Sequence, residues 1–175
     1  MSTSSGYPRA AIRGIQVVLS VMFLVSGCGM TNSVSNPLTP DQAKAQVIDA
    51  AREVVGLLGL RVVDGKANVW LESCNDQEDP PFRGAGIVGY PKAASSAESD
   101  AELANMIKVL QEHGWSGDPD FHSHGSVLKK NNVVVDFARQ NDFFETRNFD
   151  IRGECRDVTT TKATKGSTEP IDFGT

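Results

Sequence analysis

Two stretches of the chain carry apolar residues three or four positions apart, which is helical spacing. The first lies between Thr39 and Gly59, and its apolar positions are Ala43, Val47, Ala50, Ala51, Val54, Val55 and Leu58. Thr39 is a typical N-cap, Pro40 suits the first turn, and Gln42 completes a capping box. Gly59 is a natural helix stop, so the pattern predicts one amphipathic helix between these two ends.

The second helical stretch follows Ser99, which forms a capping box with Glu102. Its apolar stripe consists of Leu103, Met106, Ile107 and Leu110. A stripe of this width packs against one neighbouring layer of a domain. Gly114 is expected to end the helix, and Trp115 is expected to fold back onto the core.

Six shorter apolar segments are bounded by turn residues, as is typical of strands. The predicted strands are 60–63, 67–74, 84–90, 127–128, 133–138 and 149–157. Asp64-Gly65 and Asn131-Asn132 are tight-turn dipeptides, and each is expected to join two of these strands in a hairpin. The last strand alternates between apolar and charged positions, so we expect one side on the core and the other in water.

The predicted elements follow the order helix, hairpin, strand, and this order occurs twice, which suggests a tandem duplication. Short connections favour antiparallel pairing. The expected fold class is α+β: a two-layer sandwich of one antiparallel sheet with two helices on one face. The expected single domain covers residues 39–158. The polar segment 159–175 is expected to be a mobile tail, with Ile171 and Phe173 as its docking points.

The N-terminal region has the pattern of a bacterial lipoprotein signal peptide. Two arginines precede an apolar run from Ile15 to Val25, and two small residues follow directly before Cys28. The run is shorter than the roughly 20 apolar residues that span a bilayer. We expect cleavage of residues 1–27, a lipid on the Cys28 thiol, and a flexible polar tether over residues 28–38. The alternative is an ordinary secretion signal in which the cysteine has no role.

Length and charge limit the classes of function. Residues 28–175 are enough for one domain with a hydrophobic core. The formal net charge is −5 and there is no basic cluster, which argues against nucleic-acid binding and against electrostatic adhesion to anionic lipid. We therefore expect the protein to bind the cell membrane through the lipid alone, on the extracytoplasmic face.

Two cysteines remain once Cys28 carries the lipid. In an oxidising compartment Cys74 and Cys155 are expected to form a disulfide, and two free thiols are the alternative. The bond would close a loop of about 80 residues and stabilise the fold by roughly 4 kcal/mol. The strand pattern raises a conflict, because Cys74 lies on the side of Trp70 and not on that of Val69. The disulfide requires either that Trp70 faces inward or that the strand bulges or ends before Cys74.

These motifs resemble those of the LppA-like group, the small cell-envelope lipoproteins of mycobacteria and related bacteria. The shared features are the lipobox ending at Cys28, the Trp-x-x-x-Cys of 70–74, the Gly-Trp pair of 114–115 and the Gly-x-Cys of 153–155. The resemblance covers most of the mature chain. It implies an extracytoplasmic, lipid-anchored domain with no assigned activity, and it carries over no catalytic residue.

All three histidines lie close together in the sequence with two aspartates. His113, His122, His124, Asp118 and Asp120 offer the imidazole and carboxylate ligands that zinc and copper prefer. The sequence therefore allows a metal-binding protein or a metal-dependent enzyme. The alternative is a polar loop in which His113 interacts with the negative end of the preceding helix.

The segment from Gly84 to Gly89 matches G-x-G-x-x-G literally. A double proline precedes it and no helix follows, so no nucleotide site is expected. Gly84 and Gly86 are instead expected to leave part of one sheet face bare, so that another backbone or an aromatic ring can approach closely.

Phe143 and Phe144 are adjacent in a polar loop. If the loop is extended, both cannot point inward, and an exposed ring would suit contact with a partner. A turn that buries both rings is the alternative.

No nucleophile with an accompanying base stands out in the sequence. The leading hypothesis is therefore a non-enzymatic envelope lipoprotein that binds a protein or a lipid through the sheet or its connecting loops, with no cofactor. A carrier of an apolar ligand is a further alternative. It would need a cavity between sheet and helices, lined by Val47, Val54, Leu103 and Ile107.

Overall fold

The computed structural model describes residues 34–118, 120–121 and 123–174. Over these residues the chain forms two helices, α1 (Pro40–Leu58) and α2 (Ser96–Glu112), and seven strands. The strands are β1 (Ala67–Ser73), β2 (Phe82–Tyr90), β3 (Ser116–Gly117), β4 (Ser126–Lys130), β5 (Val133–Phe137), β6 (Arg147–Arg152) and β7 (Glu169–Pro170). They form one antiparallel sheet in the order β3-β4-β5-β6-β2-β1-β7. The α+β prediction is confirmed.

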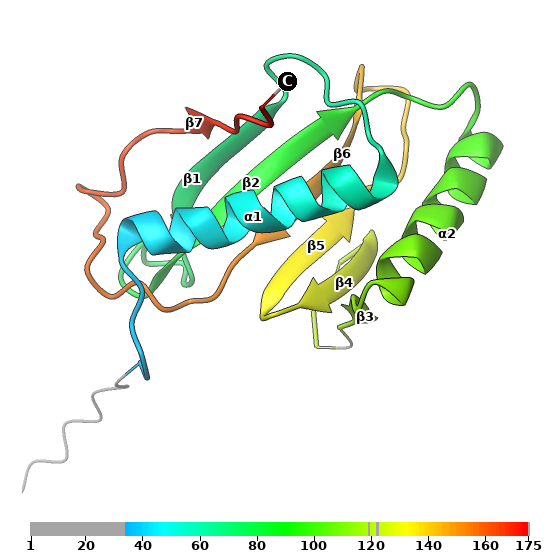
Figure 1. Ribbon diagram of the computed structural model, residues 1–175. Helices are drawn as coiled ribbons and strands as arrows, with labels where there is room; N and C mark the ends of the chain where they lie inside the picture. The colour runs from blue at the N-terminus through cyan, green and yellow to red at the C-terminus, as the bar shows by residue number, and fades with distance from the viewer. Residues whose placement is uncertain (1–33, 119, 122, 175) are drawn as a thin grey trace, which may run out of the picture. The chain divides into compact units, whose positions relative to one another are not determined.

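Both helices pack on the same side of the sheet, where α1 crosses the strands and α2 lies beside it (Figure 1). One core cluster joins apolar side chains of both helices to alternate residues of the central strands. Its members include Val47, Ala51, Val54, Val69, Val88, Leu103, Leu110, Val135, Phe149 and Ile151. The two-layer arrangement with two helices on one face therefore has the predicted form.

The ends of α1 follow the predicted capping chemistry. Thr39 Oγ1 accepts a hydrogen bond from the Gln42 amide at 3.2 Å, and Gln42 Oε1 accepts one from the Thr39 amide at 2.9 Å. The C-terminal end is closed by Gly59 in the left-handed region, at φ 58°. Both predicted ends of this helix are confirmed, because the capping residues act locally and need no tertiary partner.

Two glycines of β2 let α1 lie directly on the sheet. A Cβ added to Gly84 would stand 2.1 Å from the Ala43 carbonyl oxygen, and one added to Gly86 would stand 2.9 Å from Val47 Cγ1. No real side chain fits at such separations. The predicted close approach of another backbone is therefore confirmed, and the approaching backbone is that of α1.

The second helix begins one turn earlier than predicted, at Ser96. Its N-cap is Ser95, whose hydroxyl accepts a hydrogen bond from the Glu98 amide at 3.1 Å. Ser95 and Glu98 have the same Ser-x-x-Glu spacing as Ser99 and Glu102, so sequence spacing alone could not choose between them. Ser99 is instead 4% exposed, and its hydroxyl is 3.4 Å from a guanidinium nitrogen of Arg147.

Arg147 fastens α2 to the sheet. Its guanidinium lies 2.6 Å from the Glu102 carboxylate, donates to the Pro91 carbonyl at 2.9 Å, and faces the Tyr90 ring at 4.8 Å. At the other end of α2 the chain turns at Gly114, with φ 87°, and Trp115 is 2% exposed in the core. The predicted helix stop and the predicted burial of the indole are both confirmed.

One of the two predicted hairpins forms. Asn131 and Asn132 adopt positive φ values of 49° and 61° and join β4 to β5 as predicted. The predicted strand at 60–63 does not form, because β1 pairs with β2 on one side and with β7 on the other. The segment instead donates a hydrogen bond from the Val63 amide to the Gly89 carbonyl, 2.9 Å away. The two halves of the domain therefore do not repeat one helix-hairpin-strand unit.

The structure joins Cys74 and Cys155 in a disulfide, with their Cα atoms 6.0 Å apart. The predicted strands 67–74 and 149–157 are both shorter in the structure, since β1 ends at Ser73 and β6 at Arg152. Each cysteine therefore lies beyond the end of its strand and is free of strand alternation. Strand alternation had placed Cys74 on the side of Trp70, in conflict with the disulfide. The conflict is resolved because the strand ends before Cys74, which is one of the two predicted possibilities.

Residues 169–173, at the end of the segment predicted as a tail, pack against the sheet, and they include both predicted docking points, Ile171 and Phe173. The short strand β7 pairs with β1, and the Ile171 amide donates to the Ala67 carbonyl at 3.0 Å. Ile171 is 6% exposed, and Arg52 of α1 donates to the Asp172 carbonyl at 2.9 Å. The domain therefore extends past residue 158, because its edge strand β1 needs a partner.

Candidate functional site

The sheet has a second face, whose side chains point away from α1 and α2. Since successive side chains of a strand alternate between faces, the residues next to the buried Val69, Val88 and Ile151 lie on this outer face. Register places Asn68, Ile87, Asp150 and Asp136 in one row across β1, β2, β6 and β5. This row places an apolar side chain, Ile87, between an amide and two carboxylates.

The next row of the outer face contains small residues and leaves a hollow. Gly89 pairs with Asn148, and the Ala138 amide donates to the Asn148 carbonyl at 3.2 Å. On the other side of Gly89, its amide donates to the Lys66 carbonyl at 2.7 Å. The stem of Lys66 packs over Gly89, where an added Cβ would stand 2.7 Å from Lys66 Cβ. These residues line a groove of about 440 Å³, which we call the outer-face groove.

The loop between β5 and β6 forms the rim of the outer-face groove. The Asn141 side chain accepts hydrogen bonds from the amides of Phe143 and Phe144, at 3.0 and 3.2 Å, and so holds a tight turn. The phenyl groups are 94% and 63% exposed, respectively. The turn therefore exposes both rings, and the alternative in which it buries them is wrong. Only Phe144 lines the groove.

Several polar groups of the groove have no partner among the described residues. The side chains of Asn68, Asn148 and Asp150 make no hydrogen bond or ion pair within residues 34–118, 120–121 and 123–174. Thr146 adds an unpaired hydroxyl over the same described ranges. Each of these groups must be satisfied by water or by a ligand. Sequence analysis missed them, because only strand register reveals that they adjoin.

The electrostatics of the groove are nearly balanced. Its lining contains one cation, Lys66, and one anion, Asp150. Burial raises the pKa of the Asp150 carboxyl, the carboxylates of Asp136 and Glu72 raise it further, and the Arg152 guanidinium acts in the opposite direction. Just outside the groove Glu72 is itself paired with Arg152, at 3.5 Å.

Residues 120–121 and 123–125, between β3 and β4, cover part of the same face. The Phe121 ring lies 5.7 Å from the Arg152 guanidinium, and the Ser123 hydroxyl donates to Asp136. Gly125 is required at this point, because a Cβ there would stand 2.1 Å from Asp136 Oδ1. This loop therefore packs on the outer face beside the groove.

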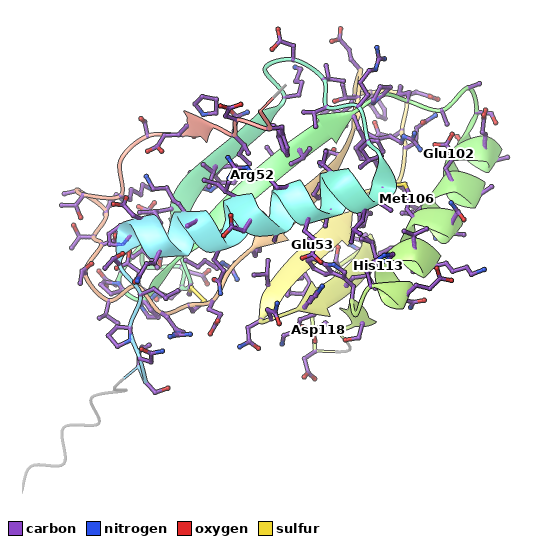
Figure 2. The ribbon with its side chains drawn as sticks, in the orientation of Figure 1. Arg52, Glu53, Glu102, Met106, His113 and Asp118 are labelled. Carbon is purple, nitrogen blue, oxygen red and sulfur yellow. A yellow bond between two sulfur atoms is a disulfide. The ribbon has the colours of Figure 1, made fainter. Side chains whose placement is uncertain are left out.

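The predicted metal ligands are dispersed as far as the structure describes them. Figure 2 shows His113 at the end of α2, where its Nδ1 is 2.8 Å from the Val109 carbonyl oxygen, and shows Asp118 beyond it. Asp118 is engaged with Lys129, at 3.4 Å, and accepts from the Asp120 amide, while His124 is exposed.

His122 lies outside the described residues. Over the ranges that are described, no three histidine, cysteine, aspartate or glutamate side chains converge as a metal site requires. The position of His113 agrees with the alternative in which its ring contacts the carbonyl end of the helix.

The predicted apolar cavity between sheet and helices is occupied by the core itself. Val47 and Val54 are 0% exposed and Leu103 is 9% exposed, all within the core cluster. A hollow of about 590 Å³ lies elsewhere, between segment 60–65 and the C-terminal residues 170–173. Its walls are mostly apolar, and it lacks the row of unpaired amides that distinguishes the outer-face groove.

None of the helices in the described part of the chain has the length and apolar character needed to cross a membrane. Cys28 and the predicted signal peptide precede the described residues. Their roles therefore remain predictions from the sequence.

Comparison with known proteins identifies one family. Residues 39–173 match the profile of the family described as "Putative lipoprotein LppJ". Proteins of that name from Mycobacterium tuberculosis, strains CDC 1551 / Oshkosh and ATCC 25618 / H37Rv, are 32% identical over 127 residues. So is the protein of that name from Mycobacterium bovis.

Each of these alignments covers 71% of this chain and 65% of the relative, slightly less than two thirds of the relative's length. No solved structure matches the chain. The match confirms the resemblance to mycobacterial lipoproteins that the short motifs indicate, and it ends at Phe173, beyond the edge strand β7. The chain belongs to the LppJ family of lipoproteins.

Proposed function

We propose that the protein is a non-enzymatic binding module, held by a lipid on Cys28 at the extracytoplasmic face of a cell membrane. In this proposal it binds a ligand in the outer-face groove. The observation that carries the binding function is the set of unpaired polar side chains on the groove, beside the exposed ring of Phe144. An aromatic side chain beside a few convergent polar groups is typical of a ligand-binding surface.

The lipid anchor is supported by the sequence around Cys28 and by the lipoprotein family. A single acyl chain binds a membrane only marginally, whereas the two chains of a diacylglyceryl group hold a protein durably. The formal net charge of −5 gives the domain no attraction of its own to anionic lipid. The anchor therefore accounts for membrane attachment, and the groove is left available for a ligand.

Binding rather than catalysis is supported by the chemistry of the lining. The described residues of the groove offer amides, a hydroxyl, one carboxylate and one ammonium group, and include no cysteine or histidine. Covalent catalysis needs a nucleophile hydrogen-bonded to a base, and within the described residues neither the Thr146 hydroxyl nor the Lys66 amine is hydrogen-bonded to one. Amides are instead typical of groups that orient a ligand.

Site-specific photo-crosslinking in the native envelope tests this proposal. A photoreactive phenylalanine analogue is placed at position 144 or 87 of the full-length protein, and in a control at Asn105 on the exposed side of α2. We expect a discrete mass increment from positions 144 and 87 and none from position 105. Equal yields at all three positions, or none from the groove, would contradict the proposed binding face.

A further inference from the structure

We infer that the outer-face groove takes a neutral polyhydroxylated ligand, such as one or two sugar units. In this arrangement Asn148 and Asp150 hydrogen-bond adjacent hydroxyl groups, and Phe144 packs against the C–H face of the same ring. The inference rests on the proposed binding function and narrows it to one class of ligand.

The first argument is the match of donors and acceptors. Asn68 and Asn148 each present an NH₂ donor and a carbonyl acceptor, and a hydroxyl group also donates and accepts. Asn148 and Asp150 are two residues apart on β6, so they lie side by side on one face at a spacing of about 6.6 Å. This spacing suits a ligand with several hydroxyls on one ring better than a ligand with a single polar group.

The second argument is charge. Lys66 and Asp150 are the charged side chains of the lining, and their charges cancel. Outside the groove, the guanidinium groups of Arg83 and Arg152 both lie close to the Glu72 carboxylate, at 2.7 and 3.5 Å, so each has an ion-pair partner. A phosphorylated ligand would find no free cluster of cations, and a polyamine would find no cluster of free anions. The balance favours a ligand with no net charge.

The third argument is the combination of apolar surface and size. Phe144 is 63% exposed at the rim, and Ile87 lies in the floor between Asn68 and Asp150. Sugar rings have apolar C–H faces that can cover such a phenyl group and remove it from water. The volume of about 440 Å³ lies within the range of small-molecule sites and is large enough for one or two sugar rings.

Binding of defined sugars to the full-length protein tests this inference. The protein is purified in a sugar-free detergent, and saturation-transfer NMR and calorimetry are recorded with glucose, galactose, mannose, xylose, maltose and lactose. Inorganic phosphate and spermidine serve as charged probes. We expect saturable binding of at least one sugar and none of either charged probe.

Two variants connect that binding to the groove. Phe144→Ala and Asn148→Leu are each expected to weaken the affinity for the sugar at least about tenfold, through loss of the stacked ring or of the amide. Phe143→Ala is the matched control, since this ring is 94% exposed in the same turn but does not line the groove. If Asn148→Leu does not fold, the comparison of Phe144→Ala with Phe143→Ala still tests the inference.

The outcomes separate the ligand class from the binding function. The sugar inference is overturned if no sugar binds, or if phosphate or spermidine binds instead. In either case, groove-specific crosslinks would still support the proposed binding function. Equal loss of affinity in Phe143→Ala and Phe144→Ala also overturns it. Absence of both sugar binding and groove-specific crosslinks overturns the two proposals together.

Discussion

Gly84 sets the distance between the two layers of the domain, because the Ala43 carbonyl occupies the place of its missing side chain. We expect Gly84→Ala to destabilise the fold by about 1–3 kcal/mol, since α1 must move away from β2. Gly56 of α1 is the matched control, because it is exposed and an added Cβ there would have nothing within 4 Å. Gly56→Ala should stabilise the protein by up to about 1 kcal/mol through helix propensity. Urea unfolding measures both, and two effects of the same sign would contradict the packing described.

Asp150 makes the stability depend on pH in an unusual direction. Because burial, aided by neighbouring carboxylates, raises its pKa in the folded state, ionisation of this group costs stability at neutral pH. The cost disappears as the pH falls below the ordinary carboxyl pKa of about 3.9. We therefore expect Asp150→Asn to unfold at a higher temperature than the wild type at pH 7 and to lose this advantage near pH 3. A variant that is less stable at pH 7 would show that the carboxylate is favourable in the fold.

Glu78 makes the stability depend on pH in the opposite direction. Hydrogen bonds and ion pairs with Lys162 and Lys165 lower its pKa to about 2. The stability it contributes is complete above its ordinary pKa of 4.5 and is lost only as the pH falls towards 2. Glu78→Gln should therefore unfold at a lower temperature than the wild type at pH 7, with the difference vanishing near pH 2. Thermal unfolding across this range measures it, and a constant difference would exclude an ion-pair origin.

Among the elements, the ends of β1 and β6 are held by the disulfide between Cys74 and Cys155. We expect replacement of both cysteines by serine to reduce the free energy of unfolding by roughly 4 kcal/mol, because the closed loop is about 80 residues long. Reduction of the wild type should give the same loss. If a reductant leaves the denaturation midpoint unchanged, the two thiols are not joined in the native protein.

The C-terminal segment is tied to the sheet by β7 and by Ile171, which is 6% exposed in the core. Ile171→Ala should cost about 2–4 kcal/mol, as other truncations of buried branched side chains do. Thr168→Ala, at an exposed position in the same segment, is the control and should have little effect. Equal denaturation midpoints for Ile171→Ala and the wild type would mean that this segment does not pack as described.

Local chemistry explains which elements the sequence predicts well. The ends of α1, the Asn131-Asn132 turn and the close approach at Gly84 depend on neighbouring residues or on the absence of a side chain. The start of α2 was misplaced by one turn because two Ser-x-x-Glu patterns compete there. The strand at 60–63 was wrong because strand pairing is decided by distant segments, here β7 with β1.

The groove illustrates the same limit for the candidate site. Its amides and carboxylate come from β1 and β6, which are separated by more than 70 residues of sequence and adjoin β2 from opposite sides. Only register brings Asn68 and Asp150 into one row. For the aromatic pair the sequence drew attention to the loop but left open whether the rings are exposed or buried by a turn; the structure exposes both.

At the scale of the whole molecule, we propose a lipid anchor joined to a disulfide-closed domain with a ligand groove. The family places the chain among lipoproteins, and in the proposed function the acidic net charge of −5 leaves membrane attachment to the lipid. In the proposed function, the anchor holds the ligand groove where the ligand is found, beyond the membrane. That proposal depends on the chemistry of one residue, Cys28.

Mass spectrometry of the full-length gene product, purified from the membrane fraction, tests this dependence most directly. We predict a mature chain that begins at Cys28 and carries a diacylglyceryl group on its sulfur, and we expect Cys28→Ser to abolish both the modification and the cleavage. A mature protein whose Cys28 thiol is unmodified, or whose residues 1–27 are still attached, would contradict it.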